Sequence, residues 1–148
     1  MMSFTDQRQP AVSPEAGSSP TSVQANASQR TILIVEDEPG VRLLLQLVLQ
    51  QTGHRLLEAH SGLQAIRMSQ QHDGAIHLVV SDVMLPDLNG PKLIEKLREH
   101  RPDLRVLFIS GYSRSILGNF PLEEGRAAFL NKPFQPTELL TLIGQLTA

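Results

Sequence analysis

The chain has 148 residues, of which 41% are hydrophobic and 19% are charged, and its formal net charge is -2. This length fits one domain with a single sizeable core, and the small net charge excludes nucleic-acid binding through a broad positive field. The chain has no cysteine, which excludes disulfides, thiol nucleophiles and thiolate metal sites. No apolar run reaches the roughly 18 residues that span a bilayer, and no secretory signal is recognisable. We therefore expect a cytoplasmic protein with no membrane or nucleic-acid partner.

The first part of the chain differs in composition from the rest. Residues 1–30 are rich in Ser, Gln, Pro and Ala, as in RQPAVSPEAGSSPTSVQANASQ, and nearly lack Leu and Ile. Such a segment cannot bury enough apolar surface to offset its chain entropy. We therefore expect a disordered leader over residues 1–30 and an ordered domain over residues 31–148.

From residue 31 onward, short apolar runs alternate with stretches of helical periodicity. In chain order, the pattern predicts a strand at 31–35, a helix at 39–52, a strand at 55–59, a helix at 61–72, a strand at 76–81, a helix at 91–100, a strand at 104–110, a short helix within 113–125, a strand at 127–131 and a last helix that ends near residue 146.

Local signals support these boundaries. The first helix is identified by apolar residues at the spacing i, i+3, i+4, i+7, which are Val41, Leu44, Leu45 and Val48. Gly53 is a typical residue to close this helix, and Ser61 is a typical N-cap for the next one. Gly118 and Pro121 leave room for only a short helix before the last strand.

The order of elements is strand then helix, repeated five times. This alternation predicts an α/β fold: a doubly wound, five-stranded parallel sheet with five helices packed on its two faces. The third and fourth strands are apolar without alternation, as expected for strands that are covered on both faces. In such sheets, ligands bind beyond the carboxyl ends of the strands.

Reactive side chains stand where four of the predicted strands end: the Glu36-Asp37 pair, Asp82, Ser110 and Lys132. Parallel strands would bring these residues to one edge of the sheet. Asp37 could supply an oxygen to a hard cation, with Glu36 acting through water, in the manner of magnesium sites. The alternative is that these acidic residues simply favour the positive end of the following helix.

Asp82 has two plausible roles, either capping a turn or acting as a nucleophile that becomes an aspartyl phosphate. The Ser110 hydroxyl could hydrogen-bond a phosphoryl oxygen, although Ser-Gly also suits a simple turn. The Lys132 ammonium could pair with Asp82 and with an incoming phosphate. Carboxylates that share a site repel one another, and Lys132 and a divalent cation together would neutralise them.

Taken together, these motifs resemble the receiver domain of two-component response regulators. The matching segments are the acidic pair at Glu36, the loop DVMLPDLNG that begins at Asp82, ISGY with Ser110, and LNKPF with Lys132. The resemblance covers residues 31–148, and the segments ISGY and FLNKPF are similar to those in receivers attached to hybrid sensor kinases.

The resemblance implies a flavodoxin-like sheet with the strand order 2-1-3-4-5. It implies that Asp82 is the phosphoacceptor and that Asp37 binds Mg²⁺ directly, with Glu36 acting through water and Met84 through its backbone carbonyl. Ser110 would contact the phosphoryl group and Lys132 would bridge to it, with a cis bond between Lys132 and Pro133. The aromatic switch position of the family falls on Phe129, which lacks the hydroxyl of the more usual tyrosine.

The sequence therefore predicts a single-domain response regulator rather than an enzyme that acts on other molecules. It would receive a phosphoryl group from a phosphohistidine of a sensor kinase or phosphotransfer protein, and it would switch a surface for an unknown downstream protein, with homodimerisation left open. One alternative is a receiver-like interaction module or phosphate sink. Another is a Mg²⁺-dependent phosphatase, which Met84 disfavours because such enzymes usually carry a second acid at this position.

Overall fold

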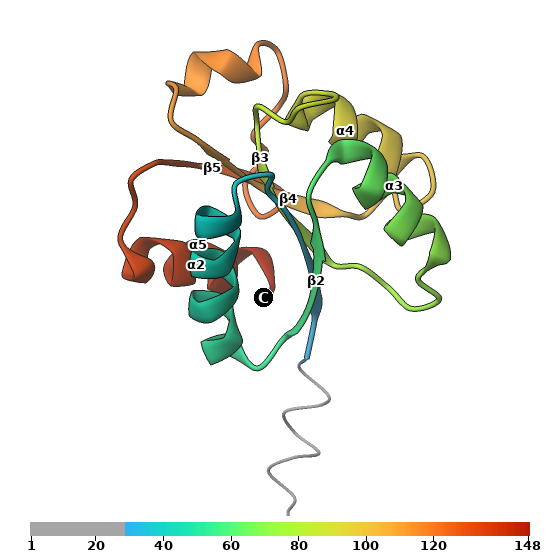
Figure 1. The fold of residues 1–148 in the computed structure, drawn as a ribbon, viewed down its shortest axis with the longest axis horizontal. Helices are drawn as coiled ribbons and strands as arrows, with labels where there is room; N and C mark the ends of the chain where they lie inside the picture. Colours follow the sequence, from blue (N-terminus) through green and yellow to red (C-terminus); the bar gives the residue numbers. More distant parts are fainter. Residues whose placement is uncertain (1–28) are drawn as a thin grey trace, which may run out of the picture.

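The computed structural model describes residues 29–148, so the predicted leader over residues 1–30 lies almost entirely outside the described residues. Five parallel strands form one sheet in the order β2-β1-β3-β4-β5, which confirms the expected topology (Figure 1). The strands are β1 (Thr31–Val35), β2 (Arg55–Ala59), β3 (Leu78–Asp82), β4 (Arg105–Ser110) and β5 (Ala127–Asn131).

The helices form one layer on each face of the sheet (Figure 1). On one face lie α2 (Pro39–Leu49) and α5 (Pro136–Leu146), and on the other lie α3 (Gly62–Gln71) and α4 (Gly90–Arg98). This doubly wound arrangement is expected when every connection between parallel strands crosses over in the same hand. Within residues 29–148, no helix is both long and apolar enough to cross a membrane.

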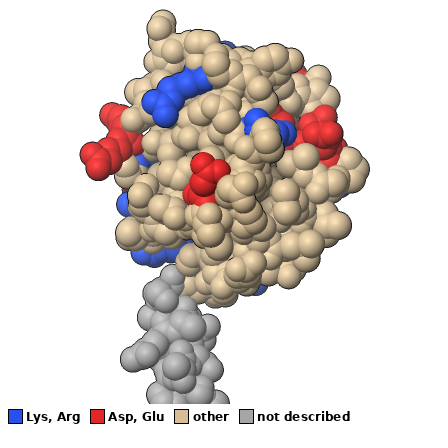
Figure 2. Space-filling view, turned by 90° about the vertical axis from the view of Figure 1, so that its left-hand side faces the viewer, with Lys and Arg blue, Asp and Glu red and all other residues tan. Residues whose placement is uncertain are grey.

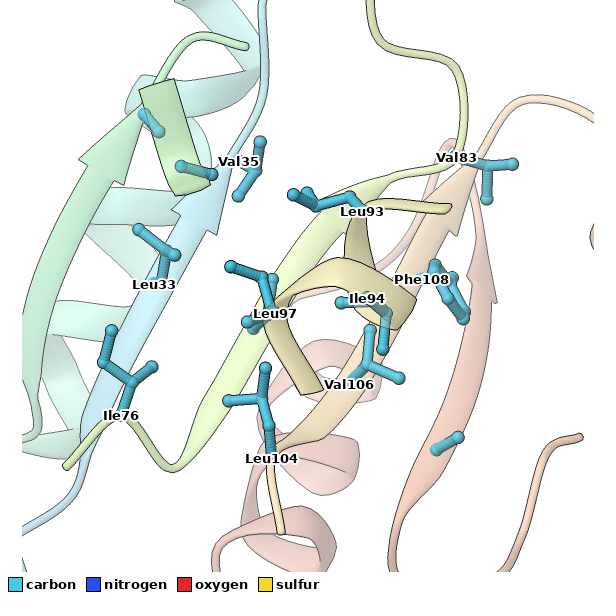
Figure 3. Packing of buried hydrophobic residues seen from close by; sticks show 14 of the residues in the cluster. Leu33, Val35, Ile76, Val83, Leu93, Ile94, Leu97, Leu104, Val106 and Phe108 are labelled. Atoms are coloured by element: carbon cyan, nitrogen blue, oxygen red, sulfur yellow. The ribbon is translucent and has the colours of Figure 1, made fainter. Parts of the chain in front are cut away.

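The side chains of the central strands alternate between the two layers. In β1, Leu33 and Val35 pack toward α3 and α4, whereas Ile32 and Ile34 pack toward α2 and α5. All residues of this strand are buried because the sheet is covered on both faces, and accordingly all of them except Thr31 are apolar. Figure 3 shows the α3/α4 side, where Ile94 of α4 lies beside Val106 and Phe108 of β4, while Leu93 and Leu97 of α4 point toward the side of Val35 and Leu33 of β1.

The register of the strands brings their carboxyl ends to one edge. Val35, the last residue of β1, pairs with Ser81, so Asp82 follows at the same level as Glu36. Asp82 in turn pairs with Ile109, one residue before Ser110. The parallel register therefore gathers the residues that follow β1, β3 and β4 without any long-range signal in the sequence.

Several predicted boundaries are confirmed, and others shift slightly. The Ser61 hydroxyl accepts a hydrogen bond from the Gln64 N–H at 3.2 Å and caps α3 as predicted. The first helix is α-helical only to Leu49; a 3-10 turn, η2 (Gln50–Thr52), then leads to Gly53, whose φ of 77° terminates it. The third strand begins at Leu78 rather than at residue 76.

The predicted count of five helices needs a correction. Residues 29–148 form four α-helices, and the connection from β4 to β5 contains only a 3-10 turn, η3 (Arg114–Leu117). Gly118 follows with a φ of 61°, which ends the turn, and Pro121 and a second glycine of positive φ, Gly125, prevent a longer helix. The glycine and proline signals for a short element are thus confirmed, but the element is a 3-10 turn rather than the predicted helix, because Gly118 ends it after four residues.

Candidate functional site

Glu36, directly after β1, is held in place by hydrogen bonds on all sides. Its N–H donates to the Ala59 carbonyl at 3.1 Å, which continues the ladder to β2, and its carbonyl accepts from the Arg42 guanidinium at 2.8 Å. Its carboxylate accepts from the Glu38 N–H at 3.1 Å. The side chain is fully buried, whereas the neighbouring Asp37 is exposed.

Asp82 ends β3 beside this acidic pair. Its Oδ1 accepts a hydrogen bond from the Met84 N–H at 2.9 Å, and its side chain is 11% exposed. One carboxylate oxygen from each of Glu36, Asp37 and Asp82 lies within 4.8 Å of the other two. The structure therefore brings together the three carboxylates that the sequence placed at the ends of two different strands.

Lys132, just after β5, reaches across this edge to the carboxylates. Its Nζ lies 2.7 Å from Asp82 Oδ2 and 3.2 Å from Glu36 Oε1, so it bridges two of the three acids. The backbone N–H of Lys132 donates to the Ser110 carbonyl at 2.8 Å, which fixes the main chain at the end of the sheet. The peptide bond between Lys132 and Pro133 is cis, as the resemblance implied.

Burial and neighbouring charges shift the pKa values of Glu36 and Lys132. Burial raises the pKa of Glu36 from 4.5 to about 7, and the charge of Asp82 adds to this rise, while the Glu38 N–H and Lys132 oppose it. Burial also works against the charged form of Lys132, but the hydrogen bond to Asp82 and the charge of Glu36 outweigh it and raise the pKa of the ammonium. Lys132 is therefore a permanent positive charge at neutral pH.

The donor set fits a hard divalent cation. Glu36, Asp37 and Asp82 offer only carboxylate oxygens, which are the ligands that Mg²⁺ prefers, and one side of the cluster is open because Asp37 is exposed. The single ammonium of Lys132 cannot neutralise three carboxylates alone. The cluster thus has both the geometry and the residual negative charge that such an ion requires.

Ser110 and Phe129 make their side-chain contacts outside the acidic cluster. The Ser110 side chain is buried, and its hydroxyl accepts a hydrogen bond from the Tyr112 N–H at 2.9 Å. Phe129 is half-buried against the core, with the Arg114 guanidinium 6.0 Å from its ring centroid. Within residues 29–148, no side-chain hydrogen bond links Ser110 or Phe129 to the carboxylates or to Lys132.

Other residues that shape this edge were not predicted. Arg42 fixes the Glu36 carbonyl, and Asn131 donates from its amide to the Tyr112 carbonyl at 2.6 Å and to the Ser110 carbonyl at 3.3 Å. Asp87 binds two backbone N–H groups at the start of α3. The contacts of Asn131 and Asp87 join segments that are 19 to 25 residues apart, so no local sequence pattern indicates them.

Comparison with known proteins gives the same family from sequence and structure. Residues 32–144 match the family model described as the response regulator receiver domain. The chain is 35% identical over 116 residues to the sensor kinase CckA of Brucella abortus (strain 2308), an alignment that covers 78% of this chain and 12% of that protein. It is 36% identical over 114 residues to the response regulator GtcR of Aneurinibacillus migulanus, covering 77% of this chain and 46% of that one.

Solved structures agree with this assignment. The receiver domain of the hybrid histidine kinase CckA superposes with a TM-score of 0.67 at 33% identity, covering 80% of this chain and 99% of that one. The response regulator TrrA of Thermotoga maritima, solved in complex with Mg(2+)-BeF, has a TM-score of 0.68 at 26% identity over 80% and 99% of the two chains. The present chain spans less than half the length of both curated relatives. The matched family model covers nearly all of the described residues, and the chain belongs to the response regulator receiver domain family.

Proposed function

We propose that this protein accepts a phosphoryl group on Asp82 from a phosphohistidine of a sensor kinase or phosphotransfer protein, in a Mg²⁺-dependent reaction. The observation that carries the proposal is the setting of the Asp82 carboxylate. One oxygen is held by the Lys132 ammonium at 2.7 Å and the other by the Met84 N–H at 2.9 Å, beside two further acids. A structural turn-capping aspartate would need none of these charged neighbours.

The residues divide the work of the transfer. An Asp82 oxygen attacks the phosphorus, forming an O–P bond as the N–P bond to the donor histidine breaks and its electron pair returns to the imidazole. Lys132 would offset the charge that accumulates on the acceptor side, and the hydroxyl of Ser110, the last residue of β4, would donate to a phosphoryl oxygen. Bound Mg²⁺ would supply further charge neutralisation for the phosphoryl oxygens, held by Glu36, Asp37, Asp82 and the Met84 carbonyl.

The proposed reaction is confined to the protein's own aspartate. Met84 stands two residues after Asp82, where an aspartyl phosphatase would need an acid or base to protonate the leaving group. The thioether of methionine cannot exchange protons. We therefore infer a phosphoryl acceptor rather than an enzyme that turns over other substrates.

The surface next to the site suits a protein donor. The side formed by α2 and α5 carries few charged side chains (Figure 2). On α2, which begins two residues after Asp37, Leu43, Leu44 and Leu47 are 53%, 44% and 53% exposed. Clustered exposed leucines are unusual on a monomer surface and favour contact with another protein. A phosphohistidine presented by a helical partner on this face would reach Asp82.

Phosphorylation is proposed to act through the segment between β4 and β5. A phosphoryl group on Asp82 would draw the Ser110 hydroxyl toward it, and Ser110 is tied to the segment that carries η3 through the Tyr112 N–H. The neighbouring Phe129 would repack, changing the surface around η3 and α5 that a downstream protein reads.

The direct test is phosphorylation with a small-molecule phosphodonor, such as acetyl phosphate, in Mg²⁺. We expect a mass increase of one phosphoryl group in the native protein, none in Asp82→Asn or in excess chelator, and a normal increase in the control Asp73→Asn, whose exposed carboxylate lies just past the C-terminal end of α3. An equal increase in Asp82→Asn, or no increase in the native protein, would refute the proposal. Rapid multiple turnover of a phosphomonoester would instead support the phosphatase.

A further inference from the structure

The loop after β3, residues 83–89, is closed on itself. Met84 and Asn89 form an isolated antiparallel bridge across it, and the Gly90 N–H donates to the Val83 carbonyl at 2.7 Å. The Asn89 side chain caps α4 by accepting from the Lys92 N–H at 2.8 Å. This loop carries the Met84 carbonyl, so its geometry decides where that oxygen points.

Asp87, at the tip of this loop, binds the start of another helix. Its Oδ1 accepts from the Gly62 N–H at 2.9 Å, and its Oδ2 accepts from the Leu63 N–H at 2.8 Å. Together with the Ser61 cap on the Gln64 N–H, these bonds satisfy the first three N–H groups of α3, which have no partner within the helix. The usual cap comes from adjacent residues, whereas here two of the three bonds come from the carboxylate of Asp87, 24 and 25 residues away in the sequence.

The same contact has an apolar component. A methyl group on Gly62 would overlap the side chain of Leu88, so the absence of a side chain at Gly62 lets the loop sit directly on the helix start. Leu88 also packs against the core on the α3/α4 side of the sheet. Burial works against the charged form of Asp87, but the hydrogen bonds from Leu63 and Gly62 outweigh it and lower the pKa of the carboxyl.

We propose that Asp87 is a positioning residue for the cation site. By tying the loop to the N-terminus of α3, it holds the Met84 main chain in register with Asp82, although Asp87 itself touches no acid of the cluster. The inference rests on the proposed function, because that function makes the Met84 carbonyl a ligand of the cation. It explains why an aspartate, a glycine and a leucine from two separate segments meet at this point.

The test measures Mg²⁺ binding without any phosphodonor, by titration of the native protein and its variants under NMR. We expect Asp87→Ala to weaken Mg²⁺ binding about tenfold, the lower end of the effect of groups that orient metal ligands. Gly62→Ala should weaken it in the same direction, because it displaces Leu88 from the other side of the contact. Asp73→Ala, just past the C-terminal end of α3, and Gly144→Ala, where a new methyl on α5 meets open space, should each change the Mg²⁺ affinity less than about twofold.

Further readouts separate positioning from stability and from charge. In Asp87→Ala, the Gly62, Leu63 and Met84 amides should exchange with solvent faster, while global unfolding by urea stays cooperative. Asp87→Asn keeps one acceptor oxygen and should restore part of the affinity, and the loss in Asp87→Ala should persist in high salt, which screens simple charge effects. The proposal would be overturned if Asp87→Ala and Asp87→Asn lose the same Mg²⁺ affinity and high salt abolishes that loss. An unchanged Mg²⁺ affinity in Asp87→Ala would overturn it as well.

The outcome also distinguishes this inference from the proposed function. If Asp87→Ala loses Mg²⁺ affinity but the native protein is never phosphorylated, the positioning role stands and the acceptor role fails. If the native protein is phosphorylated on Asp82 and Asp87→Ala binds Mg²⁺ normally, the acceptor role stands and the positioning role fails. A native protein that binds no Mg²⁺ would overturn both.

Discussion

Replacing Glu36 with glutamine should stabilise the protein at alkaline pH while weakening its cation site. Glu36 is fully buried, and burial raises the pKa of its carboxyl from 4.5 to about 7. The folded protein therefore holds this proton more tightly than the unfolded chain does. Between pH 4.5 and 7 the Glu36 carboxyl binds more protons in the folded state, so its contribution to the free energy of unfolding falls as the pH rises and levels off above pH 7.

The size of this effect follows from the shift. A rise from 4.5 to about 7 corresponds to about 3 kcal/mol of stability, present at low pH and lost by pH 8. Glutamine does not ionise, so Glu36→Gln avoids this loss. It can keep only one of the two bonds that the carboxylate makes, to the Glu38 N–H and to Lys132, which removes about 1 kcal/mol at every pH. We expect the variant to be about 2 kcal/mol more stable than the native protein at pH 8 and slightly less stable at pH 5.

The measurement is urea unfolding of both proteins at pH 5, 6, 7 and 8 in chelator, followed by circular dichroism. The informative quantity is how the difference in stability between the native protein and Glu36→Gln changes with pH. Any effect of the substitution on packing is independent of pH and cancels from this change. Addition of Mg²⁺ at pH 8 should then stabilise the native protein more than Glu36→Gln, by mass action on the folded state. If the difference in stability between the two proteins stays constant from pH 5 to pH 8, the reasoning that ionisation of the buried Glu36 carboxyl destabilises the fold is refuted.

Three further changes test other parts of the structure. Gly90→Ala should destabilise the protein by about 1–3 kcal/mol in urea unfolding, because the new methyl would lie 3.0 Å from the carbonyl oxygen that ends β3; a neutral effect would contradict this packing. The contribution of His54 and His77 to stability should be lost as the pH drops below 6.5, opposite in sign to that of Glu36, because burial lowers the pKa values of both imidazoles, whose Nδ1 atoms accept backbone N–H bonds. Relative to the native protein, the double variant with asparagine at both positions should therefore gain stability as the pH falls below 6.5, and a difference in stability that does not change with pH would contradict this. Arg101→Met should lower the free energy of unfolding by about 2 kcal/mol, because the guanidinium binds three carbonyls and a hydroxyl around the end of α3. The variant should still be phosphorylated, and loss of phosphorylation in a folded variant would show that the two ends of the sheet are coupled.

The sheet and most of the candidate site could be predicted because they depend on local patterns. An apolar strand without alternation must be covered on both faces, which makes the sheet parallel and doubly wound. Parallel strands end at one edge, so residues that follow strands converge whatever their distance in the sequence. That is why Glu36, Asp82 and Lys132 were identified together, and the structure places them within hydrogen-bonding reach. Their chemical roles remain predictions.

The rest depends on contacts that leave no local trace. Asp87 looked like an ordinary turn residue in a Pro-Asp loop, and only the packing of α3 beside that loop gives its carboxylate two N–H partners. Arg42 lies on the first turn of a helix, where nothing in the spacing indicates that it binds the Glu36 carbonyl.

The prediction of a helix between β4 and β5 was wrong for a local reason, since Gly118 ends the turn before an α-helical pattern can start.

The segment between β4 and β5 is held to the core by side chains more than by regular backbone structure. Leu117 is the one buried residue between Gly111 and Arg126, but Ile116, Phe120 and Leu122 also pack against the core, and the Phe120 ring centroid lies 5.0 Å from that of Phe108. A rearrangement of this stretch would have to move these side chains, and a fully buried side chain of this kind contributes about 1.5–3 kcal/mol. To shift such a segment from a 1:99 to a 99:1 population, a covalent event must favour the new arrangement by about 5.5 kcal/mol.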